Sequence, residues 1–160
     1  MTTGWMATQR QRVEVRLTDR SVRGDIHLQP VARLHAGPET PGDLLNREES
    51  FFALMVESEQ PLFIAKRHVL YVELPAQPAI DDPDRASAAR RVELDVELSD
   101  GSHLEGVVMI ELPPDRLRAI DFLNAAPEFF PLWSPACVRI VNKRQLRAAG
   151  PLVDIRRATT

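Results

Sequence analysis

The chain has 160 residues, of which 44% are hydrophobic and 27% charged, as in a soluble globular protein of one or two small domains. Its formal net charge of -3 gives no general attraction to nucleic acids or other polyanions. A single cysteine, Cys137, excludes an internal disulfide and a zinc site built on cysteines.

The start of the chain shows no targeting or membrane signal. Its sequence, MTTGWMATQRQR, has no apolar segment of a signal peptide, and no run elsewhere approaches the roughly 20 apolar residues of a membrane-spanning helix. Residues 1–11 also lack apolar periodicity, so we expect a flexible N-terminal segment there. The sequence therefore favours a cytoplasmic protein without a membrane partner.

Alternating apolar and polar residues predict a strand at the start of each half of the chain, since a period of two is typical of a half-buried strand. The apolar positions are Val13, Val15 and Leu17 in the first half, and Leu94, Val96 and Leu98 in the second. The turn sequences TDRS and SDGS follow, and a second strand comes after each. In these second strands, Gly24 and Gly106 indicate a bulge or a close approach of two backbones.

The block D-x-L-N-x4-F-F-x-L then occurs twice, beginning at Asp43 and at Asp121. A short carboxylate can accept hydrogen bonds from the first free amides of a helix, so we expect both aspartates to be N-caps of a helical turn. Asn46 and Asn124 are expected to be C-caps or turn residues, with contact to a ligand as the alternative. The phenylalanine pair enters a third strand and places one ring of each pair on the core side.

Each half ends with two short strands around a Lys-Arg centre. The sequences IAKRHV and VNKRQL place apolar residues five positions apart, which fits two strands joined by a tight turn. The basic residues of these turns are Lys66, Arg67, Lys143 and Arg144. Between the halves, residues 75–90 are rich in Pro, Asp and Ala, which predicts a linker.

The same order of signals in both halves indicates an internal repeat. We expect an all-β protein made of two tandem small SH3-like barrels, each with five strands and a short helical turn. The barrels are predicted at residues 12–74 and 91–150, followed by a C-terminal tail at residues 151–160.

These signals resemble those of the Sm-like family of small barrels. That family has an L-x-D-G turn after the first strand, a glycine in the second, an Asp-to-Asn element and a closing I-R-G-x-x-I signature. The sequence LSDGSHLEG matches the first part closely and LTDRSVRG loosely. The family's Arg-Gly is replaced by Asn142-Lys143 and Ala65-Lys66, so the resemblance does not imply RNA binding.

A second resemblance is to a loosely defined group of uncharacterised bacterial proteins. Their pattern R-x-x-D-x-L-N, followed by V-N-K, is matched here by Arg118, Asp121, Leu123, Asn124 and the VNK at Val141. This resemblance implies a module and no particular activity.

The sequence holds no recognisable catalytic motif. Its histidines are not at metal-site spacings, and it has neither a phosphate-binding glycine loop nor a G-x-S-x-G elbow. We therefore expect no enzyme, no cofactor and no metal. The leading interpretation is a non-enzymatic interaction or scaffolding module. The alternative is an RNA- or DNA-binding module that uses Lys66, Arg67, Lys143 and Arg144.

A comparison of the two second strands predicts a contact surface. Where the first half has Asp25 and His27, the second half has Val107 and Met109, so its strand is apolar on both faces. A strand of that kind is buried on both faces. We expect Val107 and Met109 to pack against the other half or against a second chain, with cover by neighbouring loops as the alternative.

Overall fold

The protein, known here from a computed structural model, is built mainly of β-strands. The structure describes residues 8–33, 35–57, 60–76, 90–113, 115 and 118–151. The strands of the first half are β1 (Gln9–Leu17), β2 (Ser21–Leu28), β3 (Phe51–Val56), β4 (Gln60–Ala65) and β5 (Val69–Pro75). Those of the second half are β6 (Arg90–Leu98), β7 (His103–Ile110), β8 (Phe129–Trp133), β9 (Cys137–Asn142) and β10 (Leu146–Gly150). The prediction of an all-β protein is confirmed.

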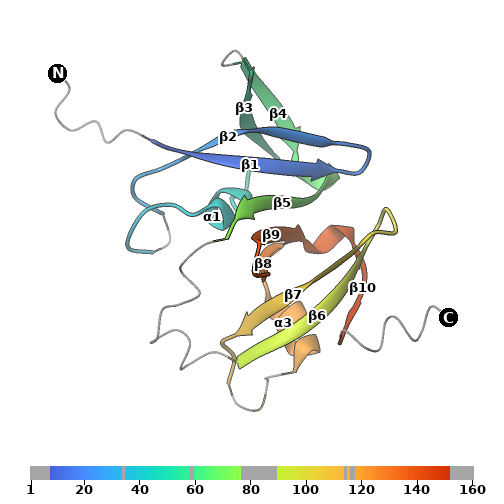
Figure 1. Cartoon of the computed structure of the whole chain (residues 1–160). Helices are drawn as coiled ribbons and strands as arrows, with labels where there is room; N and C mark the ends of the chain where they lie inside the picture. The colour runs from blue at the N-terminus through green and yellow to red at the C-terminus, as the bar shows by residue number, and fades with distance from the viewer. Residues whose placement is uncertain are drawn as a thin grey trace.

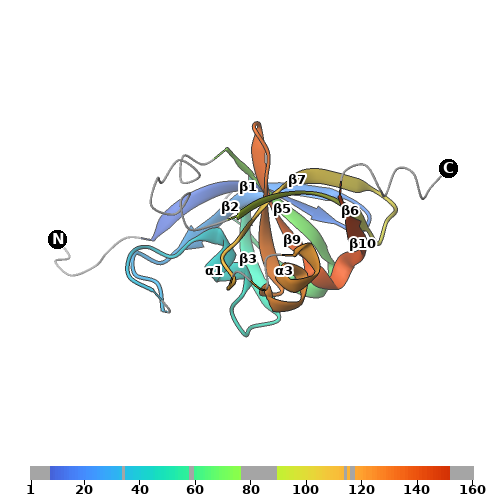
Figure 2. The same ribbon diagram turned by 90° about the horizontal axis from the view of Figure 1, so that it is seen from below.

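Short helical segments recur at the same places in both halves. A helix lies between the second and third strands, and a 3-10 turn lies between the fourth and fifth. These segments are α1 (Pro41–Leu45) and η2 (Lys66–His68) in the first half, and α3 (Ala119–Ala125) and η5 (Lys143–Gln145) in the second. Seen from below, α1 and α3 lie to one side of the hairpins β1–β2 and β6–β7 (Figure 2).

The ten strands form one antiparallel sheet, in the order β10-β6-β7-β8-β9-β5-β1-β2-β3-β4. Figure 1 shows one half above the other, joined where β5 lies beside β9. The finer prediction of two tandem five-stranded barrels is not confirmed. The sheet runs without interruption through both halves and is not closed, because β4 and β10 lie at its two ends.

The alternating apolar residues of the first strand in each half point into the core, as predicted. Val13 and Val15 of β1 and Leu94 and Val96 of β6 are buried. Strand β1 begins at Gln9, so the last residues of the segment expected to be flexible belong to the sheet. Residues 1–7 of that segment lie outside the described residues.

The boundaries of the expected linker and tail are also shifted. Strand β5 ends at Pro75 and strand β6 begins at Arg90, so both ends of the expected linker are in strands. The remainder, residues 77–89, lies outside the described part of the chain. Strand β10 ends at Gly150, and residues 152–160 of the expected tail are likewise outside it.

Helix α1 has Thr40, and not Asp43, at its N-cap position. The Thr40 hydroxyl accepts a hydrogen bond from the Asp43 backbone N at 3.1 Å, and the Asp43 carboxylate accepts one from the Thr40 backbone N at 2.8 Å. These two bonds form a capping box, so Asp43 caps the helix from its third position. Partial burial raises the pKa of Asp43, but hydrogen bonds from the Thr40 backbone and from His35 outweigh it and lower that pKa.

The second aspartate is not an N-cap either. Arg118 occupies the N-cap position of α3, and its Nε donates to the Asp121 carboxylate at 2.9 Å. The C-cap is Ala126, so Asn124 lies inside α3, whereas Asn46 is the C-cap of α1, as expected. The two blocks share the same residue pattern, but the helices that they form differ in length. Helix α1 has five residues and α3 has seven.

The two glycines of the second strands lie at close backbone contacts, one of the two roles that the sequence indicates. A Cβ atom on Gly106 would lie 2.7 Å from the carbonyl oxygen of Trp133 and 2.7 Å from Cγ of Leu132. Gly24 is equally confined by Met55 and Leu54. Only a residue without a side chain lets β7 approach β8, and β2 approach β3, this closely.

We predict that Gly106→Ala lowers the free energy of unfolding by about 1–3 kcal/mol, because the added methyl forces β7 and β8 apart. Urea denaturation measures this loss. The matched control is Gly42→Ala, where the nearest atom to an added Cβ is 3.7 Å away and alanine favours the helix. Equal stability of the two variants would contradict the close approach.

Candidate interaction surface at the open edge of the sheet

The two halves are joined by a pairing between β5 and β9. Their register runs from Tyr71 opposite Val141 to Pro75 opposite Cys137. Arg139 of β9 adds an ion pair to Glu73 of β5 at 3.1 Å. Because backbone hydrogen bonds cross from one half to the other, the sheet has no break at this point.

The outer face of the hairpin β8–β9 is buried by this junction. Phe129, Val138 and Ile140 lie on that face, are only 2%, 2% and 4% exposed, and belong to the hydrophobic core of the first half. Conversely, Leu70 of β5 belongs to the core of the second half. Full burial of such side chains contributes roughly 1.5–3 kcal/mol each, so the junction stabilises both halves.

Two asparagine side chains form hydrogen bonds across the junction. The Asn46 side chain donates to the Phe129 carbonyl oxygen at 2.9 Å and accepts from the Phe129 backbone N at 2.9 Å. Asn142 is fully buried, and its Nδ2 donates to the carbonyl oxygens of Lys66 and Val69 at 3.2 and 3.0 Å. Asn46 is therefore more than a C-cap: it holds the start of β8 against the first half.

The corresponding face of the hairpin β3–β4 is open. The same side of this hairpin carries Phe51 paired with Ala65 and Ala53 paired with Phe63. Phe51 is 55% exposed and Phe63 is 68% exposed, although they stand where the second half has the buried Phe129 and Ile140. We call these four residues the open hairpin face. Among the described strands, β4 pairs only with β3, so its outer edge is also free.

The other end of the sheet is incompletely covered. In the first half, Leu45, Val69 and Val72 are buried in the core that receives Phe129. Their counterparts in the second half are Leu123, Leu146 and Ala149, and these are only half-buried against their own core. We call these three residues the β10 surface, after the strand that carries Leu146 and Ala149.

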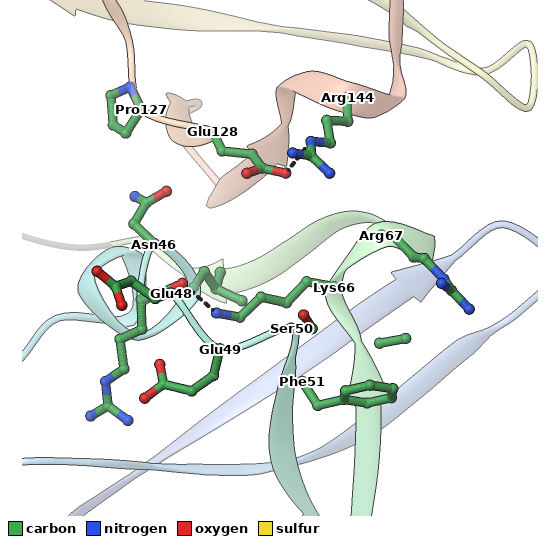
Figure 3. A pocket seen from close by; sticks show the side chains of 13 residues that line it. Asn46, Glu48, Glu49, Ser50, Phe51, Lys66, Arg67, Pro127, Glu128 and Arg144 are labelled. Carbon is green, nitrogen blue, oxygen red and sulfur yellow. Dashed lines mark hydrogen bonds and ion pairs between the residues drawn. The ribbon is translucent and has the colours of Figure 1, made fainter.

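A cavity of about 450 Å³ opens between the halves, next to η2 (Figure 3). Phe51 and Lys66 of the first half and Glu128 and Arg144 of the second half line it. Lys66 is buried and its Nζ donates to the carbonyl oxygen of Arg47 at 2.9 Å. Burial lowers the pKa of Lys66, which remains tied to the backbone and not directed at solvent.

The structure brings the two Lys-Arg turns together, since η2 and η5 are in contact. Lys143, like Lys66, is engaged with the backbone, with its Nζ 2.8 Å from the carbonyl oxygen of Ala126. Arg144 is exposed and pairs with Glu128 at 2.8 Å, and Arg67 is exposed. Of the four basic residues, the two arginines alone present their charge to solvent.

Val107 and Met109 lie on β7, which takes no part in the pairing of β5 with β9. Val107 is opposite Trp133 of β8 and Glu93 of β6, and Met109 is opposite Arg91. Both are half-buried, and neither belongs to the core of either half. Their role as a contact surface stays a prediction.

The described residues contain no group of three or more His, Cys, Asp or Glu side chains that could hold a metal ion. None of the helices in this part of the chain is long and apolar enough to cross a membrane. Comparison with protein-family models, curated proteins and solved structures finds no match. Function must therefore be inferred from the geometry of the sheet.

The sequence does not single out Phe63, and it leaves open which ring of each phenylalanine pair is buried. In the structure Phe52 is buried and Phe51 exposed, whereas Phe129 and Phe130 are both buried. The available signal is the alignment of β4 with β9, which places Phe63 at the position of Ile140. Both hairpins have an apolar outer face. Among the described residues, only the face of β8–β9 is packed against the other half, and this difference distinguishes the open hairpin face.

We predict that Asn46→Ala lowers the free energy of unfolding by about 1–3 kcal/mol, because the backbone N and O of Phe129 lose their partners. Urea denaturation of a dilute sample measures it. The matched control is Asn124→Ala, since Asn124 is the counterpart of Asn46 in the second sequence block and makes no side-chain hydrogen bond to a described residue. If both variants were equally stable, the junction role of Asn46 would be wrong.

Proposed function

We propose that the protein is a non-enzymatic interaction module that binds another protein along the open hairpin face and the free edge of β4. In this proposal the two halves are copies of one small SH3-like unit, which resembles the Sm-like family. The observation that carries the proposal is the exposure of Phe51 and Phe63, at 55% and 68%, on a face whose counterpart is buried.

Two properties of this region suit a protein partner. Large exposed apolar side chains that lie together on one face commonly mark an interaction site. An edge strand also offers unpaired backbone groups, to which an extended segment of a partner can add as a further strand. Pro61 near the start of β4 removes one backbone donor, so we expect added pairing to be centred on residues 62–65.

The alternative is an RNA- or DNA-binding module that uses Lys66, Arg67, Lys143 and Arg144. Both lysines are bound to backbone carbonyl oxygens, and Arg144 is paired with Glu128. Glu48 and Glu49 line the same cavity as Lys66, Arg67 and Arg144. Since binding to nucleic acid depends on charge that is free to meet phosphates, this distribution favours the protein partner.

The test is photo-crosslinking in cells, with a photoreactive phenylalanine analogue in place of Phe63. We expect a covalent adduct with a protein, because this ring stands in the proposed contact. The matched control carries the analogue at Ser21, an exposed position of β2 outside the open hairpin face. An adduct with RNA or DNA, or equal protein adducts at both positions, would contradict the proposal.

A further inference from the structure

We infer that the partner is a second copy of this chain, bound head to tail. The open hairpin face of one chain would pack on the β10 surface of the next, as β8–β9 packs on the first half within one chain. This inference rests on the proposed function and names its partner.

The first support is that the chain carries both sides of its own internal junction a second time. One side is a hairpin with an apolar outer face, which is β8–β9 inside the chain and β3–β4 at its end. The other side is the fifth strand of a half, which is β5 inside the chain and β10 at the opposite end. The two open surfaces thus correspond to the two sides of a contact that the molecule already makes within one chain.

The second support is that residues of the two open surfaces are less buried than their counterparts at the internal junction. On the hairpin side, Phe129 and Ile140 are buried, whereas Phe51 and Phe63 are exposed. On the fifth-strand side, Val72 is 1% exposed, whereas its counterpart Ala149 is half-buried. Within the described part of the chain, each open surface lacks the cover that its internal counterpart has.

The pairing register of the internal junction can be transferred to the open edges. Inside the chain, Val72 lies opposite Ile140 and Tyr71 lies opposite Val141. The corresponding residues place Ala149 of one chain opposite Phe63 of the next, and Ala148 opposite Ile64. Small residues on β10 leave room for the ring of Phe63, which is larger than the Ile140 side chain.

Asn124 supplies the third support. Asn46 holds the backbone N and O of Phe129 across the internal junction. Asn124 is the counterpart of Asn46 in the second sequence block, although it lies inside α3, and it makes no side-chain hydrogen bond to a described residue. In the head-to-tail contact it would meet the backbone N and O of Phe51 of the next chain.

The contact between chains should be weaker than the internal junction. The counterpart of the buried Asn142 is Ala65, which cannot make the two hydrogen bonds that Asn142 donates. Leu62 and Gly150 replace the ion pair between Arg139 and Glu73. We therefore expect association that is reversible on dilution, and since the contact is heterologous, it generates a ring or an open chain.

Sedimentation of the purified chain over a wide concentration range tests the inference. We expect the wild type to sediment as more than one 18.0 kDa chain at high concentration and as a single chain on dilution. Phe63→Asp should stay a single chain throughout, because it buries an unpaired charge in the contact. Asn124→Asp should weaken association at least about tenfold, because its carboxylate repels the Phe51 carbonyl oxygen.

The matched control is Val31→Asp, at an apolar side chain that is 58% exposed but lies outside both surfaces. It should associate like the wild type. All three substitutions are at exposed positions, and a thermal melt of each variant in dilute solution verifies that it is folded. Equal loss of association in the control would overturn the inference.

Mixing the variants tests the head-to-tail geometry. A Phe63→Asp chain keeps its β10 surface, and an Asn124→Asp chain keeps its open hairpin face, so a mixture should form a dimer with one chain of each. A symmetric contact between two β4 edges predicts instead that Asn124→Asp associates normally and that no mixed dimer forms, which would overturn the inference.

The experiments distinguish failure of this inference from failure of the proposed function. A wild-type chain that stays single at every concentration, yet crosslinks through position 63 to a different protein, overturns the inference and leaves the proposed function standing. A single chain without any protein adduct at position 63 overturns both.

Discussion

The pairing of β5 with β9 is the interaction on which the rest of this structure depends. It turns two five-stranded halves into one ten-stranded sheet. It also buries the outer face of one hairpin, so that Phe129 and Ile140 complete the core of the other half. Neither core is made by one half alone, and we therefore expect the halves to unfold as one cooperative unit.

The same pairing explains why apolar side chains are incompletely buried at the two ends of the sheet. The junction uses the hairpin β8–β9 of the second half and strand β5 of the first half, so it leaves the hairpin β3–β4 and strand β10 unused. Here the free surfaces are the open hairpin face, with Phe51 and Phe63, and the β10 surface, with Leu146 and Ala149. The exposed phenylalanines thus lie on the hairpin that this pairing does not cover.

Local features of the fold could be predicted from the sequence, because they depend on residues near one another in the chain. Alternation at Val13 and Val15 predicts the first strand correctly, and Gly106 marks a close approach of backbones. The helical turn at Asp43 is also predicted, although the N-cap is one turn earlier, at Thr40. Asp43 resembles an N-cap residue in the sequence because its short carboxylate accepts a hydrogen bond from a free backbone N at the start of the helix. It does so from the third helical position, as part of a capping box.

Long-range features could not be predicted in this way. The period of two shows that a strand has an apolar face, but not which strand covers it, since strand propensity depends on neighbours that are distant in the sequence. The alternation therefore predicts two tandem five-stranded barrels, but it does not show that one sheet runs through both halves. For the same reason Asn46 reads as a C-cap in the sequence, and only the structure shows its bonds to Phe129, 83 positions away.

The most direct measurement of the central claim is amide hydrogen exchange at several protein concentrations. The account predicts that amides of β5 and β9 are protected at every concentration, because their pairing lies within the chain. The amides of β4 and β10 that point to the open edges, and not toward β3 and β6, should exchange quickly in dilute solution and gain protection together as the concentration rises. Exchange in β4 and β10 that does not change with concentration would contradict the account, as would protection that appears in one of these two strands alone.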